Sequence, residues 1–117
     1  MFISRGSKQN FTTKELYQMT KSPEIMKMST AVDTVLDVAE WCLRIDEAPD
    51  QEEQARILSI LTPENEVYAT NSKTFIREFL DIADIFAADG IPVRRVKIAS
   101  GRSRAGRQFI TAVAVFD

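Results

Sequence analysis

Two glycines, Gly101 and Gly106, have the spacing of the glycines in a Walker A phosphate-binding loop. Arg107 and Gln108 follow them, where that loop requires Lys and then Ser or Thr. A strand-like segment comes next instead of a helix, so no helix N-terminus would face a phosphate. The segment therefore predicts a hairpin turn, and nucleotide hydrolysis is disfavoured. A turn of this kind either follows a polyphosphate backbone or is merely solvated. Its basic residues are Arg102, Arg104 and Arg107.

Histidine is absent from the chain, and Cys42 is the single cysteine. The commonest general base and the commonest metal ligand are therefore missing. The carboxylates form no compact cluster with metal-ligand spacing, so we expect no metal, no other cofactor and no enzymatic activity. A small enzyme that relies on carboxylates is the remaining catalytic alternative. Cys42 is interpreted as a core residue of a protein from a reducing compartment.

Aromatic side chains offer a second kind of chemistry, which is stacking on nucleic-acid bases. An aromatic face accepts any base, so it suits binding without sequence preference. Packing in the core is the competing interpretation for each residue. Tyr68 is the favoured candidate, because Val67 and Ala69 can contact the core on the other face of the strand. The candidates are Tyr17, Trp41, Tyr68 and Phe109.

Charge is distributed unevenly along the chain, although the net charge is only -2. Basic residues predominate in residues 1–32 and from Gly90 onward, whereas acids predominate in residues 33–89. This pattern predicts either a basic face built from the two ends of the chain or an ordinary mixed surface. The composition, 44% hydrophobic and 27% charged, indicates one soluble globular domain. Phe109 to Phe116 is too short to span a bilayer, and Met1 to Asn10 lacks the apolar core of a signal peptide.

The expected order of elements is three strands, one helix and two strands. Apolar residues at spacings of three and four predict a helix over Lys73 to Ala88, capped by Asn71 or Ser72 and ended by Gly90. This order predicts an all-β fold with one helix, a five-stranded OB-fold barrel without parallel pairs. The first strand is expected to be long and bent, because its apolar residues change face partway, although its start also has helical spacing. The expected strands are Val32 to Asp46, Gln54 to Leu61, Glu66 to Thr70, Ile91 to Ser100 and Arg107 to Phe116.

Residues 1–30 are expected to form a short helical arm, and residues 31–117 the OB-fold domain. Met1 to Asn10 is polar and expected to be mobile. Thr12 and Glu15 fit a capping box that predicts a helix over Lys14 to Met19. Ser22-Pro23-Glu24 predicts a second short helix through Met28. The apolar residues of the arm are expected to pack on one end of the barrel, with direct ligand contact as the alternative.

Two motifs in the second half of the chain carry a resemblance. The first is Tyr68-x-x-x-Ser72-Lys73-Thr74 leading into a helix, and the second is Val96-Lys97-Ile98 followed by Gly101, Ser103, Gly106 and Phe109. From about Leu58 to Val115, the chain resembles the single-stranded-DNA-binding proteins of small tailed phages that replicate by protein priming. The resemblance implies an OB fold that coats displaced strands during phage DNA replication in the host cell cytoplasm. It also implies that Tyr68 contacts DNA and that Lys97 is a basic residue of the fourth strand.

The sequence therefore predicts a non-enzymatic protein that binds single-stranded DNA with low sequence specificity, through a basic groove and aromatic residues. The expected partners are single-stranded DNA and phage replication proteins, with no membrane, and the chain is a monomer or a homodimer. The alternative is an OB-fold protein-interaction module that acts on a host or replication protein, which the acidic middle of the chain favours. The predicted DNA-contacting residues are Trp41, Tyr68, Lys73, Arg95, Lys97, Arg102, Arg104 and Arg107.

Overall fold

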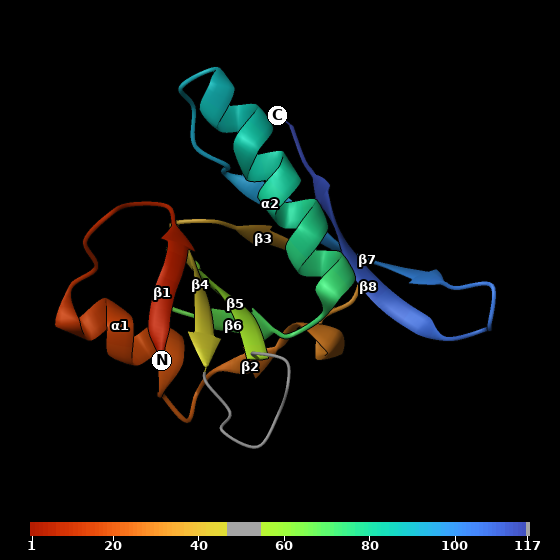
Figure 1. Ribbon diagram of the computed structural model, residues 1–117, viewed down its shortest axis with the longest axis horizontal. Helices are drawn as coiled ribbons and strands as arrows, with labels where there is room; N and C mark the ends of the chain where they lie inside the picture. The colour runs from red at the N-terminus through yellow and green to blue at the C-terminus, as the bar shows by residue number, and fades with distance from the viewer. Residues whose placement is uncertain (47–54, 117) are drawn as a thin grey trace.

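The computed structural model describes residues 1–46 and 55–116 (Figure 1). These residues form a mostly β protein with eight strands in two sheets and two α-helices. The five-stranded sheet has the order β1-β4-β5-β6-β2, and the three-stranded sheet has the order β3-β7-β8. The larger sheet contains β1 (Phe2–Gly6), β2 (Met26–Lys27), β4 (Glu40–Asp46), β5 (Ala55–Leu61) and β6 (Val67–Thr70). The smaller sheet contains β3 (Val35–Asp37), β7 (Arg95–Arg102) and β8 (Gln108–Ala114).

The segment expected to be one bent strand is two strands in different sheets. β3 pairs antiparallel with β7, and β4 pairs antiparallel with β5. Between them, the Val38 N–H donates to the Arg94 carbonyl at 2.8 Å, and the Ala39 N–H donates to the Leu61 carbonyl at 2.8 Å. The helical alternative for this segment is wrong. The change of apolar face seen in the sequence marks the point where the chain leaves one sheet and enters the other.

The closed barrel predicted from the sequence is wrong for the described residues, because β6 and β8 are not paired. β2 lies along β6 instead, in a short parallel pair that aligns Met26 with Tyr68 and Lys27 with Ala69. This parallel pair is a second departure from the expected topology. The Ser72 hydroxyl donates to the Ile110 carbonyl at 3.4 Å and joins the two sheets at this point. Apart from this side-chain hydrogen bond, β6 and β8 do not pair as strands in the described residues, so the seam between them is open.

The N-terminal arm contributes strands as well as a helix. β1, expected to be mobile, pairs antiparallel with β4. Helix α1 (Thr13–Thr20) begins at the predicted capping box, with Thr12 Oγ1 accepting from the Glu15 N–H at 3.1 Å and Glu15 Oε1 accepting from the Thr12 N–H at 2.8 Å. The second predicted helix is wrong, because β2 and a single 3-10 turn, η1 (Met28–Thr30), lie there. β1 and β2 join the same sheet as β4 to β6. The division of the chain into an arm and an OB-fold domain at residue 30 stays a prediction.

Helix α2 (Lys73–Ala88) has the predicted bounds and packs against β8. The Ser72 hydroxyl accepts from the Phe75 N–H at 3.3 Å, and Gly90 follows the helix in the left-handed region with φ 69°. Phe75 and Phe79 are fully buried between the helix and the sheets. In residues 1–46 and 55–116, no helix is long and apolar enough to cross a membrane.

The opposite face of the five-stranded sheet carries a second, smaller apolar cluster. Met19 from α1 packs there against Cys42, Leu61 and Val67. The Ser59 hydroxyl donates to the Met19 carbonyl at 2.7 Å beneath the same helix. The arm is expected from the sequence to pack on one end of a barrel, but α1 packs on one face of this open sheet instead. Both faces of the sheet are therefore covered over part of their length.

Candidate functional site

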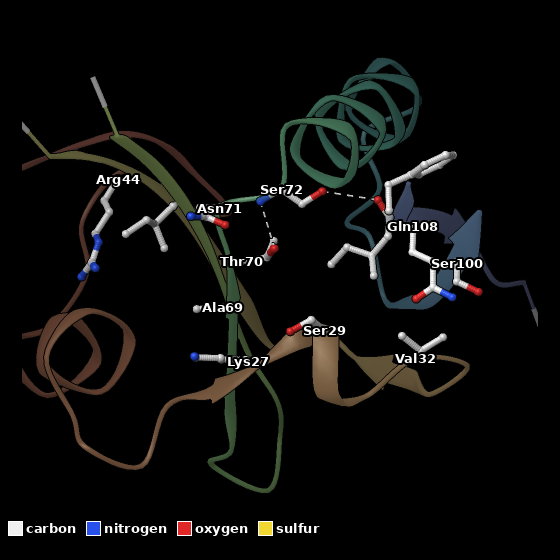
Figure 2. Close-up of a pocket in the computed structure, with 13 residues that line it drawn as sticks. Lys27, Ser29, Val32, Arg44, Ala69, Thr70, Asn71, Ser72, Ser100 and Gln108 are labelled. Carbon is white, nitrogen blue, oxygen red and sulfur yellow. Dashed lines mark hydrogen bonds between the residues drawn. The ribbon is translucent and has the colours of Figure 1, made fainter. Parts of the chain in front are cut away.

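A groove of about 760 Å³ opens at the seam between β6 and β8. Figure 2 shows Arg44 on the left, Ser100 and Gln108 on the right, Thr70 to Ser72 between them and Lys27 below Thr70. The groove therefore lies where a closed barrel would have continuous strand pairing. The residues that line it are Lys27, Ser29, Val32, Arg44, Ile57, Ala69, Thr70, Asn71, Ser72, Ser100, Gln108, Phe109 and Ile110.

The alternation of side chains along the strands decides which residues reach the groove. Arg44 lies directly opposite Ile57 in the β4–β5 pair, so the two side chains share the sheet face on which α1 packs. Ser100 lies opposite Ile110 in the β7–β8 pair, on the same face as the buried Ile98. The groove thus joins the α1 side of one sheet to the inner side of the other.

Two cations, Lys27 and Arg44, line the groove, and no Asp or Glu is among its described lining residues. The arm holds Lys27 in place, because β2 pairs with β6 and the next side chain, Met28, is fully buried. In addition, the Thr30 hydroxyl donates to the Lys27 carbonyl at 2.7 Å. The groove therefore has a positive lining in a chain whose net charge is -2.

Arg44 is held more rigidly than a typical surface arginine. Its side chain is only 14% exposed. Its Nη1 donates to the Thr20 carbonyl at the end of α1, where the unpaired carbonyls of a helix favour a cation. Its Nε lies 3.6 Å from Asp46 Oδ2. These contacts thus hold the guanidinium in place at the groove.

The β7–β8 hairpin extends the positive charge beyond the groove. Its turn is closed by the Ser103 N–H, which donates to the Arg107 carbonyl at 2.9 Å, and Gly106 adopts φ 79°. Arg102 follows Ser100 by two residues on β7, so it shares the face of the hairpin that borders the groove. The structure thus brings together the three predicted hairpin arginines, all exposed: Arg102, Arg104 and Arg107.

Phe109, not Tyr68, is the predicted aromatic that lines the groove. Phe109 lies opposite Gly101, and its ring covers that glycine so closely that an added Cβ would be 2.6 Å from Cζ of the ring. The Tyr68 ring packs against the main core. Its hydroxyl donates to Glu66 Oε2 at 3.3 Å, and burial and then Glu66 raise the pKa of Tyr68. An acid beside Tyr68 disfavours a nearby phosphate.

Trp41 is the predicted contact residue that lies deepest in the protein. Its side chain is 7% exposed, and its ring meets Phe79 edge-on with the centroids 5.2 Å apart. Tyr17 is exposed on α1 and is not among the lining residues. The position of Trp41 leaves no ring face for a base while the core is packed.

The other predicted basic residues lie outside the groove lining. Arg95 and Lys97 alternate with the buried Val96 on β7, so they lie on the outer face of the smaller sheet. Arg95 Nε donates to Asp37 Oδ1 at 3.1 Å. Lys73 is exposed at the first position of α2, next to the groove residue Ser72.

Sequence reasoning missed Lys27 and Arg44 as site residues. The excess of basic residues before residue 33 pointed to the arm but not to Lys27 in particular. Arg44 carried no signal beyond its polar position in an apolar strand.

Cys42 is fully buried, and burial raises the pKa of its thiol to about 11. Within the described ranges, no group of three or more His, Cys, Asp or Glu could hold a metal ion.

Comparisons with protein-family models, with curated proteins and with solved structures found no match to this chain.

Proposed function

We propose that this protein binds single-stranded DNA with little sequence preference in the groove between β6 and β8. One observation carries the proposal: Lys27 and Arg44 line the groove, no described lining residue is Asp or Glu, and the groove borders the arginine hairpin. The acid paired with Arg44, Asp46, faces it at 3.6 Å but is not a lining residue. A strand laid in the groove would release counterions from each phosphate that these cations neutralise.

The strand pairing supports this proposal through its relation to an OB fold. We interpret β3 and β4 as the two halves of the first OB strand, followed by β5, β6, α2, β7 and β8. OB folds bind oligonucleotides on the face of strands two and three and with the loop between strands four and five. In this interpretation, β5 and β6 supply that face and the β7–β8 hairpin supplies that loop. Fold alone does not define function, so the lining residues remain the main argument.

The groove would act by binding alone. Lys27, Arg44 and the hairpin arginines contact phosphates, and Phe109 offers a ring to a base at the rim. Neither contact depends on base identity, which accounts for low sequence specificity. We propose no cofactor and no catalytic step. Together with the resemblance of the second half of the chain to phage single-stranded-DNA-binding proteins, this mechanism fits a protein that coats displaced strands during phage DNA replication in the host cytoplasm.

A fluorescence anisotropy titration with a labelled oligothymidine tests the proposal. The expected result is binding at low salt that weakens linearly in a plot of log affinity against log salt concentration. A duplex of the same length is the competitor, and it should bind more weakly because its bases are not available for stacking. Absence of oligonucleotide binding at low salt would exclude the proposed function.

A protein-interaction module is the second candidate, and exposed apolar side chains near the end of α2 favour it. Ile85, Ile91 and Phe116 are 66%, 50% and 75% exposed, and the Phe116 ring lies 5.5 Å from that of Phe86 at the end of α2. Exposed apolar side chains that gather on a surface mark interaction sites in many soluble proteins. If the titration fails, these side chains become the leading candidate site. Polar replacement of Phe116 should then abolish capture of a phage or host replication protein.

A further inference from the structure

Among the described residues, Arg44 has an incomplete set of hydrogen bonds at the edge of the groove. A guanidinium presents five N–H donors. Nη1 of Arg44 donates to the Thr20 carbonyl, but Nε is buried and has no hydrogen-bond partner in the part of the chain that the structure describes. A buried donor without a partner is unfavourable because it has lost its hydrogen bond to water.

Asp46 faces this guanidinium without completing the missing bond. Asp46 Oδ2 is 3.6 Å from Arg44 Nε, which is an ion-pair distance but is too long for a hydrogen bond. Asp46 Oδ1 is also buried and also lacks a hydrogen-bond partner among the described residues. Arg44 and Asp46 are two residues apart on β4, so both side chains lie on the same face of the strand. The two charges compensate each other, yet each side chain keeps a hydrogen bond unmade among residues 1–46 and 55–116.

A phosphate group can satisfy Arg44 better than Asp46 does. Guanidinium binds phosphate with two parallel hydrogen bonds of the charge-assisted type. Lys27 lines the same groove and supplies a second positive charge. The Thr20 carbonyl restrains the guanidinium, so less side-chain entropy is lost when a phosphate binds.

We infer that Arg44 is a phosphate-binding residue of the groove and that Asp46 competes with DNA for it. This inference rests on the proposed function. When DNA binds, a backbone phosphate replaces Asp46 as the partner of Arg44, and the Asp46 carboxylate turns toward water. A single phosphate ion must displace Asp46 in order to make one contact with the groove, whereas a polynucleotide makes several phosphate contacts at once. Asp46 therefore favours chains of phosphates over small anions.

The test is the same oligothymidine titration at low salt, carried out with Asp46→Asn. This variant removes the competing charge and keeps every hydrogen bond that Arg44 makes to Thr20. We expect it to bind about fivefold more tightly, the size of one unit-charge interaction at about 4 Å in water. The matched control is Asp84→Asn, which also removes an acid from an ion pair, with Arg5 at 2.6 Å, but outside the groove lining. The control should bind like the wild type.

Two further variants test the exchange of partners directly. Arg44→Gln should weaken binding, and adding Asp46→Asn to it should give no gain, because the competing acid acts only through Arg44. Arg44→Lys keeps the charge but loses the planar fork, so it should bind more weakly than the wild type even when its melting temperature is unchanged. This lysine variant serves if Arg44→Gln does not fold.

Failure of the inference and failure of the proposed function give different results. If wild type binds and folded Asp46→Asn gains no more affinity than Asp84→Asn, Asp46 does not compete and the inference is overturned. An equal gain from Asp46→Asn with and without Arg44 would also overturn it. If wild type itself does not bind at low salt, the proposed function fails, and the inference fails with it.

Discussion

Replacing the three hairpin arginines with glutamine should reduce the salt dependence of DNA binding by a defined amount. Arg102, Arg104 and Arg107 are exposed, and none of them forms an ion pair with an acid in residues 1–46 and 55–116. Their removal therefore breaks no ion pair of the described fold, and the melting temperature should change little. The variant isolates the contribution of the hairpin to phosphate binding.

The magnitude follows from counterion release. Each phosphate neutralised on a single strand contributes about 0.7 to the slope of log affinity against log salt concentration, so three contacts contribute about 2. Raising the salt from about 50 to about 200 mM should then weaken the wild type roughly 20-fold more than the variant. Anisotropy titrations at four salt concentrations measure both slopes.

A matched variant separates local contacts from net charge. Lys14, Arg77 and Arg94 are exposed and outside the groove lining, so their replacement by glutamine removes the same charge at a distance. This control should keep nearly the full slope. If the hairpin variant also keeps the full slope, the arginine turn is only solvated, and the phosphates must follow another path.

Three further predictions concern the core and the rim of the groove. Trp41 is buried against Phe79, so its fluorescence should not change when an oligonucleotide is added, and DNA-induced quenching would contradict this packing. For the same reason, Trp41→Ala should destabilise the protein by about 3–5 kcal/mol, as measured by urea unfolding. Burial raises the pKa of Cys42 from 9.0 to about 11, so the free energy of unfolding should not depend on this thiol below pH 9.0. As pH rises from 9.0 toward 11, the thiol ionises more readily in the unfolded chain, and the free energy of unfolding should fall. Urea unfolding of Cys42→Ala over the same pH range should not show this loss. A Cβ at Gly101 would lie 2.6 Å from the ring of Phe109, so Gly101→Ala should lower the free energy of unfolding by about 1–3 kcal/mol. Because the ring must move, Gly101→Ala should also weaken oligonucleotide binding, as Phe109→Ala should. Normal stability and affinity of Gly101→Ala would show that the ring has another place to pack.

Local sequence signals determined the elements that depend on near neighbours in the chain. The bounds of α2 follow from apolar residues at helical spacing between a serine cap and Gly90. The start of α1 follows from the capping box of Thr12 and Glu15. β5, β6 and the β7–β8 hairpin were recognisable because alternation and turn residues are also local. The hairpin arginines could therefore be grouped from the sequence alone.

Elements that exist only because of a distant partner could not be predicted in this way. β1 lies in a ten-residue segment that is mostly polar in sequence, and it becomes a strand where it pairs with the edge of β4. β2 has two residues, too few for any periodicity, and is defined by its pairing with β6. The break at Val38 and Ala39 reflects hydrogen bonds to residues of two different sheets.

The groove itself is a product of tertiary structure. The sequence supplied its cations and the bias of basic residues toward the two ends of the chain. Only the fold placed Lys27 and Arg44 beside one groove, buried Trp41 and turned Tyr68 toward the core and Glu66. The physical reason is that β2 pairs with β6 while β8 packs against α2, so the edges of β6 and β8 do not meet and the space between them is left open.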